Sequence, residues 1–157
     1  MIIKQTIQLK ENANLVWEFV SNIESVAKCI PGLDEITAVE ADKQYKVVAN
    51  EKVGPFKVSF PMDLEVEELK QPVMKLKATG QDKYTKTHVI VNLVVNIEPN
   101  STTEGTDIKV NVDLQMKGKL ATLGQGIINR KFTSKVDEFT ENLTAVLEGG
   151  KQDVTAL

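Results

Sequence analysis

The residue types that carry out most enzyme chemistry are sparse in this chain of 157 residues. It contains one histidine, His88, and one cysteine, Cys29. A nucleophilic site needs a base beside a hydroxyl or a thiol, and nothing in the sequence brings His88 and Cys29 together. His88 alternates with the inward residues of its predicted strand, so we expect it to face solvent. Cys29 is expected to be a small buried residue. The sequence therefore predicts no catalytic residue and a protein that is not an enzyme.

Neither a metal site nor a phosphate-binding loop is indicated. Metal binding needs several histidine, cysteine or carboxylate side chains that converge, and the acidic residues mostly occupy outward strand positions. The densest acidic group, Glu65, Glu67 and Glu68, is typical of a solvated strand end. Gly118 and Gly124 approach a helix, but no Lys-Ser/Thr pair follows them as a phosphate-binding loop requires. We expect no metal and no cofactor.

Composition and charge exclude other classes of protein. Hydrophobic residues make up 41% and charged residues 26% of the chain, as in an ordinary soluble domain. The net charge of −3 and the absence of a basic cluster interleaved with aromatics argue against nucleic acid as a partner. No apolar run approaches 18 residues, and the first residues alternate rather than forming a signal peptide. We predict a cytoplasmic protein, with peripheral contact at the inner face of the membrane as an alternative.

A long amphipathic helix is predicted over residues 118–148, where apolar residues recur on one stripe about 100° wide. Gly149 is expected to end it in a left-handed conformation, so that one domain occupies residues 1–148 and a short flexible tail residues 149–157. Leu120, Leu123 and Ile127 lie off the main stripe, near Gly124 and Gly126. Three interpretations remain open for this segment: loops packed over the leucines, room left for a ligand, or a surface for a partner.

The remainder of the chain is predicted to form a curved sheet. Alternation of apolar and polar residues predicts about seven strands, at 1–9, 36–39, 44–53, 56–67, 73–79, 84–97 and 106–116, with short helices at 13–20 and 23–29. One apolar and one charged face per strand indicate a single antiparallel sheet covered on one side. A long twisted sheet must curl, and the long helix is available to fill the curl. The predicted fold class is α+β.

Four stretches carry a resemblance to a known family. Residues 16–19 (VWEF), 29–32 (CIPG), 52–60 (KVGPFKVSF) and 118–124 (GKLATLG) resemble signature stretches of CoxG, a family of carbon monoxide dehydrogenase subunits. The resemblance runs from about residue 2 to residue 147. It implies the helix-grip fold of the START-like (SRPBCC) superfamily, in which the sheet wraps around a long C-terminal helix and two short helices follow the first strand. Family members often carry arginine where this chain has Gly126.

What the resemblance implies for function is an apolar-ligand-binding domain. In some relatives such a domain is associated with recruiting a molybdenum hydroxylase to the membrane or with handling a quinone. The leading hypothesis is a non-enzymatic accessory protein that binds a lipid or a quinone-like molecule and serves a molybdenum hydroxylase of the carbon monoxide dehydrogenase type. One alternative is an assembly or membrane-recruitment docking factor with a filled core. A helix-grip hydrolase or cyclase is a further alternative.

The candidate site residues share an inward phase and lie near the first turns of the long helix. An apolar interior with few polar groups fits a lipid-like or isoprenoid ligand. The predicted ligand-binding wall consists of Trp17, Val20, Phe56, Val58, Phe60, Met62, Val91, Leu93, Val110, Val112, Leu114, Gly124, Ile128 and Phe132. The predicted cavity mouth, or partner contact, consists of Ile30, Pro31, Gly32, Gly54, Pro55, Leu120, Leu123 and Ile127.

Overall fold

The computed structural model describes the backbone of residues 1–156 and the side chains of residues 1–149. The chain begins with strand β1 (Ile2–Leu9), followed by the short helices α1 (Ala13–Val20) and α2 (Ile23–Ala27). Six strands come next: β2 (Leu33–Glu40), β3 (Gln44–Val53), β4 (Phe56–Lys70), β5 (Val73–Gln81), β6 (His88–Pro99) and β7 (Thr106–Lys117). A 3₁₀ turn, η1 (Lys119–Leu123), leads into the long helix α3 (Gln125–Ala156).

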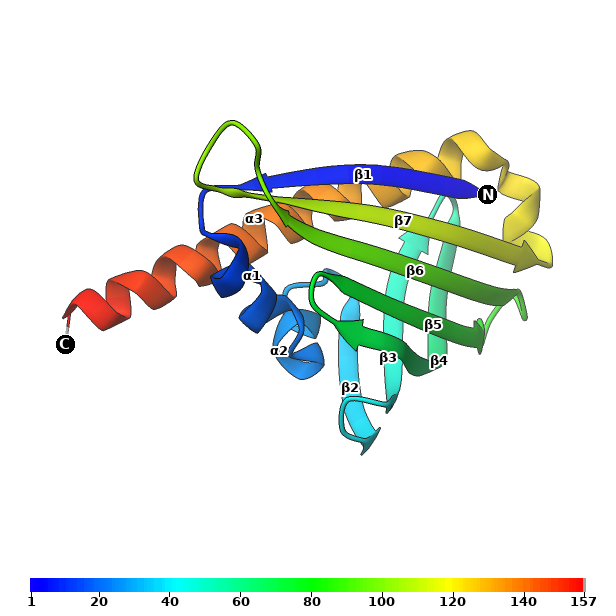
Figure 1. Ribbon diagram of the computed structural model, residues 1–157. Helices are drawn as coiled ribbons and strands as arrows, with labels where there is room; N and C mark the ends of the chain where they lie inside the picture. Colours follow the sequence, from blue (N-terminus) through cyan, green and yellow to red (C-terminus); the bar gives the residue numbers. More distant parts are fainter. Residues whose placement is uncertain (157) are drawn as a thin grey trace.

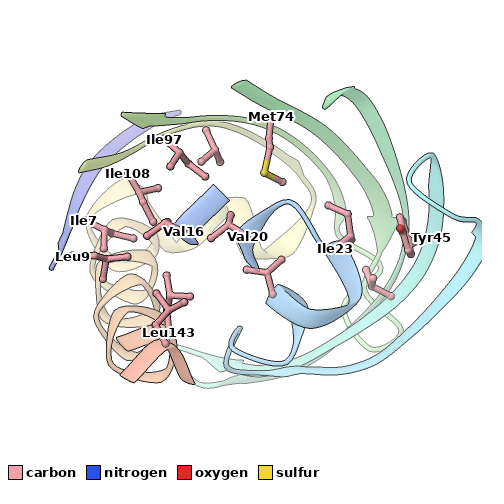
Figure 2. Packing of buried hydrophobic residues seen from close by; sticks show 14 residues of the cluster. Ile7, Leu9, Val16, Val20, Ile23, Tyr45, Met74, Ile97, Ile108 and Leu143 are labelled. Carbon is pink, nitrogen blue, oxygen red and sulfur yellow. The ribbon is translucent and has the colours of Figure 1, made fainter. Parts of the chain in front are cut away.

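All seven strands form one antiparallel sheet, in the order β1-β7-β6-β5-β4-β3-β2. Strands β2 to β7 are a simple meander, and β1 is added at the β7 end of the sheet as an edge strand. The sheet curves, and α3 and the two short helices lie on its concave side (Figures 1 and 2). This arrangement confirms the predicted α+β class and the helix-grip layout.

The two short helices begin where asparagine side chains cap them. The Asn12 side chain accepts a hydrogen bond from the Leu15 backbone N–H at 2.9 Å, and Asn22 accepts one from the Ser25 N–H at 3.1 Å. Each bond satisfies a donor that would otherwise lack a partner in the first helical turn. The structure confirms the bounds of the first predicted helix. The second ends at Ala27, two residues earlier than predicted.

The long helix differs from its prediction at both ends. Residues 119–123 form a 3₁₀ turn, and Gly124 adopts φ of +86°, so the α-helix starts only at Gln125. At the other end, α3 continues through Gly149, and Gly149 is not among the glycines with positive φ. Glycine permits a left-handed helix end but does not impose one. The predicted helix end at Gly149 is therefore wrong, and the predicted tail is helical as far as Ala156.

A second correction concerns the strand predicted at 84–97, which begins only at His88. The Asp82 carboxylate accepts hydrogen bonds from the Thr85 backbone and hydroxyl, and Lys86 has φ of +62°. These features turn residues 82–86 into a tight loop. An aspartate side chain that accepts hydrogen bonds from the next few residues competes with the backbone hydrogen bonds of a sheet. The alternation of apolar residues does not reveal this competition.

The first helical turn of α3 allows a direct test of stability. A Cβ atom built on Gly126 meets no atom within 4 Å, and its backbone is helical. We expect Gly126→Ala to raise the free energy of unfolding by about 0.5–1 kcal/mol, because alanine loses less backbone entropy on folding. Urea unfolding followed by circular dichroism measures the change. Gly124→Ala is the matched control and should destabilise the protein, since alanine is strained at φ of +86°.

Two buried clusters form the core. The first lies around α1 and α2, where Val16, Val20 and Ile23 are buried in one cluster with Met74, Ile97 and Ile108 of the sheet (Figure 2). Leu143 and Leu147 complete it from α3. The second cluster lies at the other end of the sheet and consists of Val53, Val58, Phe60, Val89 and Leu120. Each end of the concave face is therefore closed by tightly packed side chains.

Candidate functional site

The middle of the concave face is less tightly covered than its two ends. Strand β6 shows this most clearly, because its inward residues Val89, Val95 and Ile97 are buried whereas Val91 and Leu93 between them are only half-buried. Inward side chains in the interior of a strand are buried when a packed layer covers them. Val91 packs against the second cluster and Leu93 against the first, and the intermediate exposure of both shows that the layer over the sheet covers them incompletely at this level.

We call this middle region the central apolar wall. It consists of half-buried side chains of β4, β6, β7 and α3: Met62, Val91, Leu93, Val110, Leu114, Ile128 and Phe132. Met62 packs against both buried clusters, Leu93 and Val110 pack against the first, and Val91 and Leu114 pack against the second. Ile128 and Phe132 belong to neither cluster. All seven residues are among those predicted to bind a ligand.

Helix α3 is held against the two flanks of the curved sheet. Its closest backbone approaches to the strands are to β1 and β3. On one flank, the Gln5 amide of β1 donates a hydrogen bond to the Thr133 hydroxyl at 3.5 Å. On the other flank, Glu51 of β3 forms ion pairs with Lys131 and Lys135. The helix thus bridges the sheet, and the central apolar wall lies beneath the bridge.

A hollow of about 360 Å³ opens beside the start of α3. It is lined by Met1, Leu114, Gln115, Met116, Ala121, Gly124, Gln125 and Ile128. Leu114 and Ile128 belong to the central apolar wall, so this hollow connects the wall with the surface. A larger hollow of about 470 Å³ lies over β3 to β5 and is lined mainly by polar and charged side chains, which suit an apolar ligand poorly.

The other predicted wall residues lie in the packed parts of the core or at the surface. Val20, Val58, Phe60 and Val112 are buried, and Trp17 and Phe56 are half-buried against the clusters. Gly124 is exposed and lines the hollow.

The structure differs from the predicted mouth at one residue, Leu120. Leu120 is fully buried in the second cluster, so it is neither a mouth nor a partner contact. A Cβ on Gly54 would lie 3.5 Å from Leu123, and the Gly32 carbonyl accepts a hydrogen bond from the Asn50 N–H at 2.8 Å. Gly54 and Pro55 are exposed, and Gly32 is half-buried. The prediction misplaced Leu120 because the short 3₁₀ turn rotates it inward relative to a continuous α-helix.

Two polar residues of the concave face were missed from the sequence. Glu51 shares the inward phase of Tyr45, Val47, Ala49 and Val53 on β3, and Gln5 shares that of Ile3, Ile7 and Leu9 on β1. The alternation itself could have found both, because residues two apart in a strand share a face. They were overlooked because a charged or amide side chain is expected to face water.

The electrostatics of Glu51 follow from its two partners. Burial by itself would raise the pKa of Glu51, but hydrogen bonds from Lys131, Lys135 and the Lys52 backbone outweigh it and lower the pKa below the usual value of a glutamate. The Glu51 carboxylate and the Lys131 ammonium lie 2.8 Å apart. Glu51 is therefore ionised at neutral pH, inside a mostly apolar concave face.

The two residues considered for catalysis lie where the sequence predicted them. His88 is exposed, and Cys29 is buried with its thiol pKa raised by burial. A buried thiol with a raised pKa is a poor nucleophile. Within residues 1–149, no three histidine, cysteine or acidic side chains come together as a metal site would require. No helix in the described part of the chain is both long and apolar enough to cross a membrane.

Comparison with known proteins decides the family. The model of CoxG, the family of carbon monoxide dehydrogenase subunits named above, matches residues 6–148. The chain belongs to the CoxG family. A search among curated proteins found none that is significantly similar in sequence.

Several solved structures share the fold at low sequence identity. A conserved protein from Geobacillus kaustophilus is similar with a TM-score of 0.83 at 19% identity, over 95% of this chain and 96% of that one. A START superfamily protein from Mycobacterium smegmatis has a TM-score of 0.71 at 12% identity, over 94% and 97%. The Zhui aromatase/cyclase from Streptomyces sp. R1128 has a TM-score of 0.61 at 14% identity, over 98% and 95%. CoxG membership and the START-like fold support a ligand-binding or accessory protein.

Proposed function

We propose that this CoxG protein binds a lipid or a quinone-like molecule between the curved sheet and the first half of α3. The observation that carries the proposal is the half-buried state of inward apolar residues such as Val91 and Leu93, between two fully packed ends. The hollow beside Gly124 reaches two other residues of the wall, Leu114 and Ile128, from the surface. An apolar wall with a few polar groups is the usual lining of a site for an apolar small molecule.

Its role in the cell would be that of an accessory protein rather than an enzyme. Family membership supports service to a molybdenum hydroxylase of the carbon monoxide dehydrogenase type, with peripheral contact at the inner face of the membrane where such apolar molecules reside. The exposed His88 and the inert Cys29 supply no catalytic pair. An apolar ligand carried between the membrane and a redox enzyme would account for both the central apolar wall and the family.

Native mass spectrometry of protein purified from its own host tests the proposal. We expect a bound quinone, isoprenoid or fatty acid at about one molecule per chain. The purified protein should also bind added decylubiquinone or oleate, with Trp17, the single tryptophan, as a fluorescent reporter. A protein that is empty as isolated and that binds neither compound would contradict the proposal.

A matched pair of substitutions on β6 tests whether the ligand occupies the space beneath α3. Val91→Phe enlarges a side chain of the central apolar wall, and Val94→Phe makes the same change on the outer face of the same strand. We expect Val91→Phe to weaken ligand binding at least tenfold with little loss of stability, and Val94→Phe to leave binding unchanged. A filled interior would instead show overpacking, with Val91→Phe costing about 1–3 kcal/mol of stability.

A further inference from the structure

A charged cluster lies on the concave face, between β3 and α3. Glu51 of β3 pairs with both Lys131 and Lys135, which stand one turn apart on α3. Phe132, a residue of the wall, lies between the two lysines in sequence. Across the sheet, Glu51 faces Val58 of the second buried cluster. The cluster therefore adjoins the second buried cluster through Val58, and Phe132 links it along α3 to the central apolar wall.

Its charges do not balance. Two ammonium groups share one carboxylate, which leaves a formal charge of +1. The side chains of Lys131 and Lys135 are only 32% and 25% exposed, and that of Glu51 only 24%. A positive charge partly removed from water and not fully paired is costly, and a negative group placed beside it recovers part of that cost. The cluster is thus better suited to an anion than to a neutral or cationic group.

We propose that the ligand of this protein is amphipathic, with an anionic head group, either a carboxylate or a phosphate monoester, held by Lys131 and Lys135. The apolar chain of the ligand then lies along the central apolar wall, starting at Phe132 and Ile128. This inference rests on the proposed function, because it assigns the chemistry of one end of the same ligand. It adds a head-group site to what would otherwise be a purely apolar cavity.

Glu51 has a separate part in this site. Its carboxylate holds two like charges side by side, four residues apart on the helix, where they would otherwise repel each other. It also occupies donors that a ligand anion would use. Removing the charge of Glu51 should therefore strengthen anion binding, whereas a site that served only to fix α3 on β3 would lose binding of every ligand alike.

Three single-chain compounds that differ only in the head group test the inference: oleate, oleyl phosphate and oleyl alcohol, each below its micellar concentration. The wild-type protein should bind both anions at least tenfold more tightly than the alcohol. In the Lys131→Met/Lys135→Met double variant that preference should fall to about twofold or less, with binding of the alcohol retained. Glu51→Gln should raise the preference several-fold.

Matched controls keep the test interpretable. Lys46→Met removes an exposed lysine that pairs with Asp63 on the outer face of β3 and β4, and it should leave the preference unchanged. If the double variant does not fold by circular dichroism, the single variant Lys131→Met, at the more exposed lysine, replaces it and should lower the preference by at least threefold.

Two failures are distinguishable. Equal binding of oleate and oleyl alcohol by the wild-type protein, or an unchanged preference in the folded lysine variant, would overturn the head-group site and leave the apolar site standing. Binding of none of the three compounds would overturn the proposed function itself.

Discussion

Replacing Asp82 with alanine is expected to lower the free energy of unfolding by about 3–5 kcal/mol. The Asp82 side chain is fully buried, and its carboxylate accepts hydrogen bonds of 2.6 Å from the Ser59 N–H, the Thr85 N–H and the Thr85 hydroxyl. Alanine would remove this partner from the buried Ser59 N–H and from the partly buried Thr85 N–H and hydroxyl. Chemical unfolding at pH 7 measures the loss, and a change below about 1 kcal/mol would contradict this account.

The pH dependence of stability gives a second measure of the contribution of Asp82. Burial by itself would raise the pKa of Asp82, but hydrogen bonds from the Thr85 hydroxyl and from the backbone of Thr85 and Ser59 outweigh it and lower the pKa below its usual range. A carboxyl group with a lower pKa in the folded than in the unfolded state stabilises the protein fully above the unfolded value of about 3.9. The stabilisation is lost as the pH falls through the folded value.

We therefore expect the stability of the wild-type protein to fall on acidification below about pH 4 more steeply than that of Asp82→Ala. Asp82→Asn is the informative control, because it keeps one acceptor oxygen but cannot ionise, and should be intermediate at pH 7. Identical slopes for wild type and Asp82→Ala would mean that Asp82 does not contribute to the acid sensitivity.

The Asp82 loop matters because it supports the second buried cluster. Thr85 and Thr87 share a hydrogen bond of 2.8 Å between their hydroxyls, and the Thr87 hydroxyl accepts one from the Leu120 N–H at 3.1 Å. The loop before β6 thus holds the 3₁₀ turn that places Leu120 in the core. Loss of Asp82 is expected to loosen this end of the concave face as well as the loop.

Leu120→Ala is the second change with a large expected effect, a loss of about 2–5 kcal/mol in the free energy of unfolding. Leu120 is fully buried among Val53, Val58, Phe60 and Val89, so its truncation leaves a cavity. Leu123 is three residues away on the same turn but only half-buried, and Leu123→Ala should cost less than about 2 kcal/mol. Thermal and urea unfolding of both variants provide the comparison.

Comparing Leu120→Ala with Leu123→Ala also shows whether η1 serves the core or a docking surface. If Leu120 served a partner at the surface, Leu120→Ala would leave the stability of the isolated chain nearly unchanged. A loss for Leu120→Ala that is no larger than for Leu123→Ala would contradict the structural account of η1.

The order and face of the strands were accessible from the sequence because they depend on local alternation. The clean pattern from Phe56 to Val66 predicted β4, and Asn12 predicted the start of α1. In a half-buried antiparallel sheet, a shift of one residue would move every apolar side chain to the wrong face, so the pattern strongly specifies which side faces the core. The family followed from short stretches such as 52–60, and the family model confirms it.

The candidate site was predictable only in part. The five strand residues of the central apolar wall share the phase of buried residues on their strands, because residues two apart in a strand lie on one face. Whether the space beside them is packed or open depends on how far α3 stands from the central strands. No local pattern encodes that distance, because it depends on contacts of α3 with strands far away in the sequence, such as the ion pairs with Glu51 of β3.

The sequence by itself determined the fold class, the face of each strand and the family, because each rests on short-range periodicity or on short motifs. Only the tertiary structure decided the positions of Leu120, Glu51 and Asp82. Leu120 is buried because Gly124 breaks the helix and Thr87 holds the turn, Glu51 faces inward because two lysines of α3 reach it, and Asp82 ionises in the core because a loop supplies its donors. Each depends on partners distant in the chain or on backbone geometry, which residue patterns do not encode.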